Sequence, residues 1–65
     1  MTTLVRLQLP RDYDDRILYL QRLKYWLMDR AVGHYFETED EQHLPTLLYI
    51  HDDEGATAFK LKFGL

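Results

Sequence analysis

The sequence contains no cysteine and no serine. Without cysteine there are no disulfides and no thiolate metal sites, so the protein lacks the cross-links on which small secreted domains depend. Serine and cysteine are also the usual nucleophiles of acyl transfer, and the chain has neither. The three glycines are each isolated in the sequence, whereas a loop that cradles phosphate needs several close together. These absences favour a protein that is not an enzyme.

Long apolar runs are also missing. No segment approaches the roughly 20 apolar residues that a membrane-spanning helix requires. The first ten residues, MTTLVRLQLP, do not combine a basic head with a long apolar run, as a secretory leader does. We therefore expect an intact cytoplasmic protein with no membrane segment.

Hydrophobic and aromatic residues are abundant for so short a chain. The 65 residues are 46% hydrophobic and 14% aromatic, which is too rich for a disordered chain. A chain of this length forms one domain at most and buries only about 60% of its unfolded surface. We predict a single domain, residues 1–65, whose small core favours assembly as a homodimer or with another partner.

The charges are distributed unevenly along the chain. Residues 1–32 carry six basic and four acidic side chains, a net of +2, and residues 33–65 carry two basic and seven acidic ones, a net of −5, which gives −3 for the whole chain. The acidic residues Glu39, Asp40 and Glu41 follow one another closely. They either are solvated in a loop or meet a basic surface on a partner protein.

The first third of the chain predicts a strand and a long helix. Residues 3–9 alternate between apolar and polar side chains, which indicates a half-buried strand that Pro10 ends. Asp12 is a good helix N-cap. We expect the helix to run from there to about Val32, with Gly33 as the left-handed residue after its C-cap.

Residue spacing gives this helix two apolar faces. The broader arc is expected to lie against the sheet and contains Tyr13, Ile17, Leu20, Leu23, Leu27, Met28 and Ala31, with Trp26 at its edge. On the opposite side Leu18, Tyr25 and Val32 recur at intervals of seven. Single apolar groups are normal on protein surfaces. A contact with a second copy or with another protein is the functional alternative, which the small core and the nearby tryptophan and arginine favour.

The second half predicts further strands. HYFETE (residues 34–39) and TLLYIH (residues 46–51) have the composition of two antiparallel strands. DDEG (residues 52–55) fits either a hairpin turn or the start of a short helix. Residues 59–63 alternate between apolar residues and lysine, which predicts a final strand.

The expected fold is α+β, with one long helix packed on a small, mostly antiparallel sheet. The order of elements is β-α-β-β-β, or β-α-β-β-α-β if the short helix forms, which is a reduced ferredoxin-like arrangement. The expected core consists of Val5, Leu7, Leu9, Leu20, Leu27, Leu48, Ile50, Phe59, Leu61 and Phe63.

The ionisable residues show no pattern of a catalytic or metal site. His34, His43 and His51 have no recognised ligand spacing. Every acidic residue lies in a polar run, without the contrasting environments that acid–base catalysis needs. We expect no catalytic residue, no cofactor and no metal.

Two binding functions are compatible with the sequence. We favour a small non-enzymatic module that binds or modulates a protein, and that is itself a homodimer; its predicted contact residues are Leu18, Arg22, Tyr25, Trp26, Val32, Glu39, Asp40 and Glu41. The alternative is a small nucleic-acid-binding protein that uses the basic and aromatic helix face, Arg22, Lys24, Tyr25 and Trp26. The net acidic charge makes nucleic acid the less favoured partner.

The last ten residues carry one resemblance. ATAFKLKFGL is an Ala-x-x-Phe-Lys-Leu-x-aromatic ending that follows an acidic turn, and it resembles the ends of small uncharacterised proteins of tailed bacteriophages. The resemblance implies a phage-encoded protein in the cytoplasm of an infected bacterium and favours a modulator of a host protein. It transfers no activity and no site residues.

Overall fold

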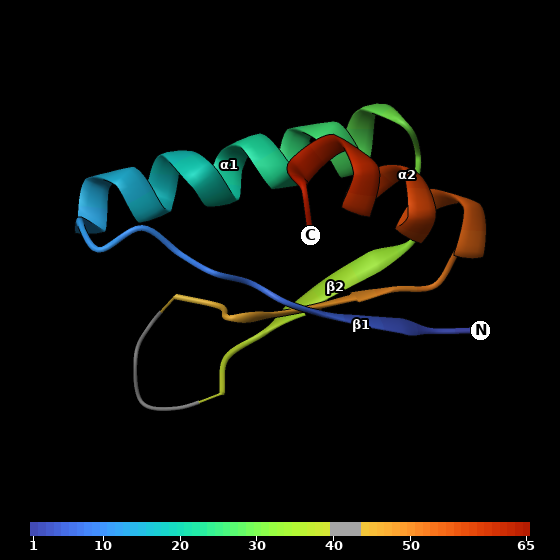
Figure 1. Cartoon of the computed structure of the whole chain (residues 1–65), viewed down its shortest axis with the longest axis horizontal. Coiled ribbons are helices and arrows are strands. Elements are labelled where there is room, and N and C mark those ends of the chain that lie inside the picture. Colours follow the sequence, from blue (N-terminus) through green and yellow to red (C-terminus); the bar gives the residue numbers. More distant parts are fainter. Residues whose placement is uncertain (40–43) are drawn as a thin grey trace.

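Three strands and two helices make up the part of the chain that the structure describes, residues 1–39 and 44–65. In this computed structural model the elements are β1 (Thr3–Arg6), α1 (Tyr13–Asp29), β2 (His34–Glu37), β3 (Leu47–Ile50) and α2 (Asp53–Phe63). Both helices lie on the same face of the sheet (Figure 1). The predicted α+β class, with a long helix on an antiparallel sheet, is confirmed. The order β-α-β-β-α matches neither predicted order, because the last element is a helix.

The sheet has β3 at its centre. It pairs antiparallel with β1 on one side and with β2 on the other. Ile50 lies opposite Thr3 of β1 and opposite His34 of β2. Because α1 connects two strands that flank a third, the first four elements form the split β-α-β arrangement of ferredoxin-like folds.

Helix α1 begins where the sequence predicts. The carboxylate of Asp12 accepts a hydrogen bond from the amide of Asp15 at 3.2 Å. Asp14 and Asp15 lie in the first turn, where carboxylates complement the unpaired amides and the positive end of the helix dipole. The predicted N-cap is therefore confirmed.

The end of α1 differs from the prediction. The amide of Val32 donates to the carbonyl of Leu27 at 2.9 Å, and the amide of Ala31 donates to the carbonyl of Met28 at 3.1 Å. These two bonds form a Schellman turn, with Ala31 in the left-handed conformation at φ 54°. The prediction that Gly33 fills this position is wrong, and the turn directs Val32 into the core instead of onto the outer face.

The final predicted strand is wrong, because residues 53–63 form helix α2. Asp52 caps the helix by accepting a hydrogen bond from the amide of Glu54 at 3.2 Å, and Gly64 ends it in the left-handed conformation at φ 70°. Phe59 and Phe63 are four residues apart, so a helix places them on one face just as well as a strand does. Leu61 then lies on the other side and is 80% exposed, so its predicted place in the core is also wrong.

The core lies between the sheet and the two helices. Five side chains are fully buried: Leu23, Leu27, Leu48, Ile50 and Phe59. Val5 and Leu7 are buried as predicted, and Leu9, Leu20 and Phe63 are packed against the core and partly buried. Three residues predicted to face the sheet are exposed instead, namely Tyr13, Met28 and Ala31.

The position of α2 explains why Met28 is exposed. Helix α2 packs against the side of α1 that carries Trp26, with Phe59 and Phe63 against the indole. The buried arc of α1 is therefore rotated toward α2 and away from Met28. A close approach at Gly55 holds the start of α2, since a Cβ atom there would lie 2.8 Å from Cγ1 of Val32.

Candidate protein-binding surface

Helix α1 exposes a row of large apolar side chains. Leu18 is 63% exposed, Tyr25 is 67% exposed and Met28 is 59% exposed. Leu18 and Tyr25 are seven residues apart, which is two helical turns, and Met28 lies three residues further on. We call Leu18, Tyr25 and Met28 the outer stripe. Large apolar groups exposed along one side of a helix are compatible with a contact site.

Beside the outer stripe, a groove separates α1 from α2. Trp26 lies at its base, with its ring edge-on to Phe59 and Phe63 at centroid distances of 5.8 and 5.9 Å. The guanidinium of Arg30 lies 4.7 Å from the centre of the indole, within cation–π range. Trp26 therefore anchors the two helices to each other, and only part of its ring is open to a partner.

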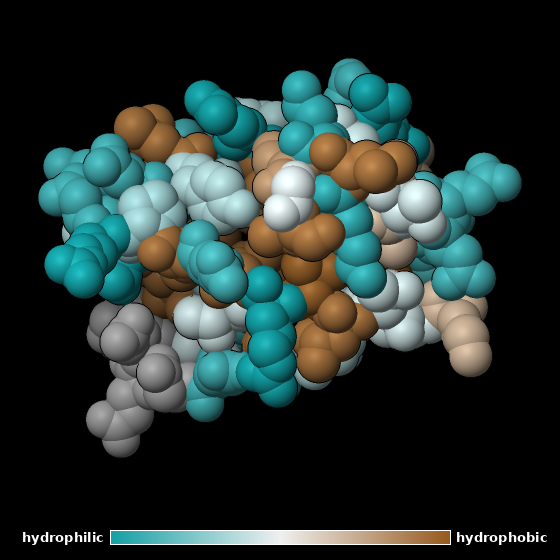
Figure 2. All heavy atoms as spheres, viewed as in Figure 1, coloured by the Kyte–Doolittle hydropathy of each residue, from teal (hydrophilic) through white to brown (hydrophobic). Residues whose placement is uncertain are grey.

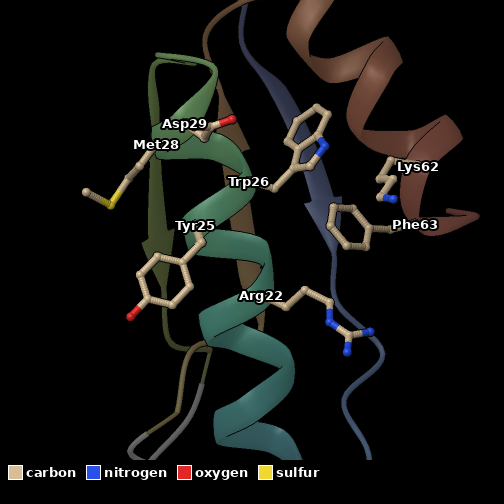
Figure 3. Close-up of a pocket in the computed structure, with 7 residues that line it drawn as sticks. All are labelled: Arg22, Tyr25, Trp26, Met28, Asp29, Lys62 and Phe63. Atoms are coloured by element: carbon tan, nitrogen blue, oxygen red, sulfur yellow. The ribbon is translucent and has the colours of Figure 1, made fainter.

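Charged side chains lie around this groove, which is open to solvent and has a volume of about 890 Å³. Figure 3 shows Arg22 and Trp26 pointing from α1 toward α2, and Lys62 and Phe63 reaching the groove from α2. Tyr25 and Met28 point away from α2, onto the outer stripe. The groove and the outer stripe together give an apolar centre with a polar rim, which is the usual anatomy of a protein–protein interface. We call this combination the helix surface.

The structure places the predicted contact residues in different parts of the molecule. Leu18, Arg22, Tyr25 and Trp26 belong to the helix surface. Val32 is buried in the core and cannot contact a partner, so its predicted role is wrong.

The acidic residues of the prediction lie elsewhere. Glu39 forms an ion pair with Arg6 at 2.5 Å, with both side chains exposed. An exposed pair of this kind contributes little to stability. Asp40 and Glu41 lie outside the described residues.

Three of the four residues predicted for nucleic-acid binding, Arg22, Tyr25 and Trp26, line one groove, and the fourth does not. Lys24 lines a separate hollow with Ile17, Leu20 and Phe36. The ring of Trp26 contacts the two phenylalanines of α2 and the guanidinium of Arg30, so only part of it is available for base stacking. Tyr25, which is 67% exposed, is the more open aromatic ring beside Arg22.

Sequence reasoning missed the uncovered face of the sheet. Tyr35 and Tyr49 lie opposite each other on β2 and β3 and stack there at 4.6 Å, and His51 lies 5.5 Å from Tyr35. The alternation within β2 and β3 was the available signal, because residues two apart share one face. Partial burial raises the pKa of Tyr49, and the nearby Glu37 carboxylate, which accepts its hydrogen bond, raises it further.

The histidines have ordinary structural partners. The ring of His34 hydrogen-bonds the carbonyl of Val32 at 2.7 Å, and the ring of His51 hydrogen-bonds the hydroxyl of Thr2 at 2.9 Å. His43 lies outside the described residues. Across residues 1–39 and 44–65 no three histidine, aspartate or glutamate side chains gather as metal ligands would.

Among the described residues, the two helices are α1 and α2, and neither is long and apolar enough to cross a membrane. Comparison with protein-family models, with curated proteins and with solved structures found no match. The helix surface is therefore interpreted from its own residues.

Proposed function

We propose that this chain is a small non-enzymatic module that binds another protein through the helix surface. The observation that carries the proposal is the outer stripe, where Leu18, Tyr25 and Met28 remain more than half exposed while the core is filled by other residues. Their exposure costs hydrophobic free energy of roughly 25 cal/mol for each Å² of apolar area that a partner could cover. A partner that covers the stripe recovers this free energy.

The charged rim indicates what such a partner presents. Arg22 and Lys62 lie on the groove with one acid, Asp29. A partner with an apolar side chain at its centre and a carboxylate at its edge complements this surface. Tyr, Trp and Arg are also the residues that most often dominate the binding energy of interfaces.

We extend the proposal to the source of the partner. The resemblance of ATAFKLKFGL to the ends of phage proteins supports a phage-encoded modulator whose partner is a protein of the host cytoplasm. No activity is transferred with this resemblance. The proposal about the helix surface does not depend on it.

Affinity capture from an extract of the cell that naturally makes the protein tests the proposal with a matched pair of variants. Tyr25→Glu places a charge on the outer stripe, and Leu61→Glu places the same charge on an exposed leucine of α2 that lines a different hollow. We expect one protein to be retained by the wild type and by Leu61→Glu, and lost with Tyr25→Glu. Equal retention by both variants would show that the outer stripe is not the contact.

A gel-shift series at low salt addresses the nucleic-acid alternative. Binding that weakens steeply with salt and with Arg22→Ala would favour nucleic acid over protein as the partner. We expect no shift at micromolar protein, because the chain is net acidic and Lys24 lies in a different hollow from Arg22, Tyr25 and Trp26.

A further inference from the structure

Strand β1 has a free edge whose hydrogen-bonding groups can be assigned. The amide of Leu7 donates to the carbonyl of Thr46 at 2.9 Å, and Val5 lies opposite Leu48 in the same register. Antiparallel ladders alternate, so every second residue of a strand directs its amide and carbonyl toward the neighbouring strand. Thr3, Val5 and Leu7 therefore bond to the β3 side.

The residues between them, Leu4 and Arg6, direct their amides and carbonyls away from β3. Since β1 is an edge strand of the described sheet, these groups have no ladder partner there. They lie one on each side of Val5. Free groups of this kind can pair with an added strand.

This edge is complementary to itself. If a second β1 approaches antiparallel with Val5 opposite Val5, then Leu4 of each copy lies opposite Arg6 of the other. Each of these two pairs exchanges two hydrogen bonds. All the free amides and carbonyls of Leu4 and Arg6 are then satisfied in both copies.

The side chains agree with the same register. Residues that face the helices recur at odd positions, and the pairing places Met1 opposite Leu9 and Thr3 opposite Leu7 of the second copy. Met1 is 97% exposed in the single chain. On the uncovered face the same register would place Leu4 of each copy opposite Arg6 of the other, whose charge is balanced by Glu39.

A hollow adjoins β1. It has a volume of about 350 Å³, lies between β1 and the end of α2, and is lined by polar and apolar residues alike: Leu4, Val5, Arg6, Gln8, Lys60, Gly64 and Leu65. In Figure 2 apolar side chains reach the surface between the helices and the strands below them. A second strand in this position covers apolar side chains of both copies.

From the free edge, the self-complementary register and the adjoining hollow, we propose that two copies of this chain pair through β1, antiparallel about a two-fold axis at Val5. The result is one continuous six-stranded sheet with all four helices on the same face. This contact uses a surface distinct from the outer stripe, so the two proposals can fail separately.

Proline at position 4 provides the test. Leu4→Pro removes the outward amide and leaves the amides that bond to β3 in place, whereas Leu4→Ala removes the same side chain and keeps the amide. In sedimentation equilibrium we expect the wild type to form dimers with micromolar affinity. We expect Leu4→Pro to weaken the dimer by about tenfold or more, because two ladder bonds are lost per dimer, and to weaken it more than Leu4→Ala does. Circular dichroism checks that both variants are folded.

Amide hydrogen exchange of the wild type gives a second test that needs no variant. We expect the amides of Leu4 and Arg6 to become protected as the protein concentration rises, and those of Val5 and Leu7 to be protected at every concentration. A monomer at all concentrations up to about 300 μM would overturn the proposal. So would a dimer that Leu4→Pro and Leu4→Ala weaken equally, or exchange at Leu4 and Arg6 that does not depend on concentration.

Discussion

Helices α1 and α2 lie on the same face of the sheet, but their outer surfaces differ. The outer surface of α2 is mostly polar, with Glu54, Thr57 and Lys60 exposed beside a single large apolar side chain, Leu61. That of α1 carries the three residues of the outer stripe and adjoins the groove. The fold needs only the inner side of each helix. The proposed binding function of α1 would account for this difference.

The inner sides differ as well. Helix α2 is short and buries Gly55, Ala56 and Phe59, so it packs closely through small residues and one large ring. Helix α1 is longer and buries Leu23 and Leu27 fully. Stability should accordingly depend on a few positions of α2 and not on the outer stripe.

Phe59→Ala should have the largest effect. The side chain is fully buried and contacts Trp26 and Phe63, and its loss should lower the free energy of unfolding by about 3–5 kcal/mol. A domain of this size has little more to lose, so the variant should be largely unfolded. Leu61→Ala is the matched control and should change the free energy by less than about 0.5 kcal/mol. Comparable losses in urea unfolding would mean that both residues face the core, as a strand requires.

Gly55→Ala should destabilise the contact between the start of α2 and the turn that follows α1. The new methyl group lies 2.8 Å from Cγ1 of Val32, and the overpacking should outweigh the better helix propensity of alanine, for a net loss of about 1–2 kcal/mol. In a Val32→Ala background that clash is removed, so the loss should shrink. A double-mutant cycle from thermal unfolding measures this coupling. A gain in stability from Gly55→Ala alone would contradict the close packing.

Ala31→Gly should stabilise the protein by about 0.5–1 kcal/mol. Ala31 occupies the left-handed position at the end of α1, which costs a residue with a Cβ atom about 1–2 kcal/mol. Helix α2 already has a glycine, Gly64, at the equivalent position. Gly33→Ala serves as the control, since the nearest atom to its new methyl group is Cβ of His51 at an ordinary 3.7 Å. If chemical unfolding shows that Gly33→Ala lowers the free energy of unfolding and that Ala31→Gly does not raise it, then Gly33 and not Ala31 is the left-handed residue, as the sequence predicted.

Leu18→Gln and Tyr25→Gln should have the smallest effect on stability. Both side chains are more than half exposed, so each substitution should change the free energy of unfolding by less than about 0.5 kcal/mol at a concentration where the chain is monomeric. A loss of 2 kcal/mol or more in urea unfolding would mean that the outer stripe supports the fold.

The start of the fold could be predicted from the sequence, because the decisive signals there are local. Alternation predicts strand β1, which ends at Arg6 rather than at the predicted Leu9, and the cap at Asp12 predicts the start of α1. The final helix could not be distinguished from a strand by Phe59 and Phe63, which share a face in both structures. Asp52 and Gly64 were the available signals for a helix, one at each end of it.

The candidate surface was predictable only in part, because it depends on where α1 ends. Spacing placed Leu18 and Tyr25 correctly, since both lie within the helix. The same spacing failed for Val32 because the turn at Ala31 interrupts it. The groove beside Trp26 depends on how α2 packs against α1. Residue spacing within α1 cannot predict that packing.

Site-specific photo-crosslinking tests the central claim most directly. A photoreactive amino acid replaces Tyr25 on the outer stripe in one variant and Leu61 on α2 in another, and each is irradiated in the producing cell. We predict a single discrete adduct with another protein from position 25 and only background from position 61. The same adducts from both positions, or none from position 25, would contradict the claim that the helix surface binds a protein.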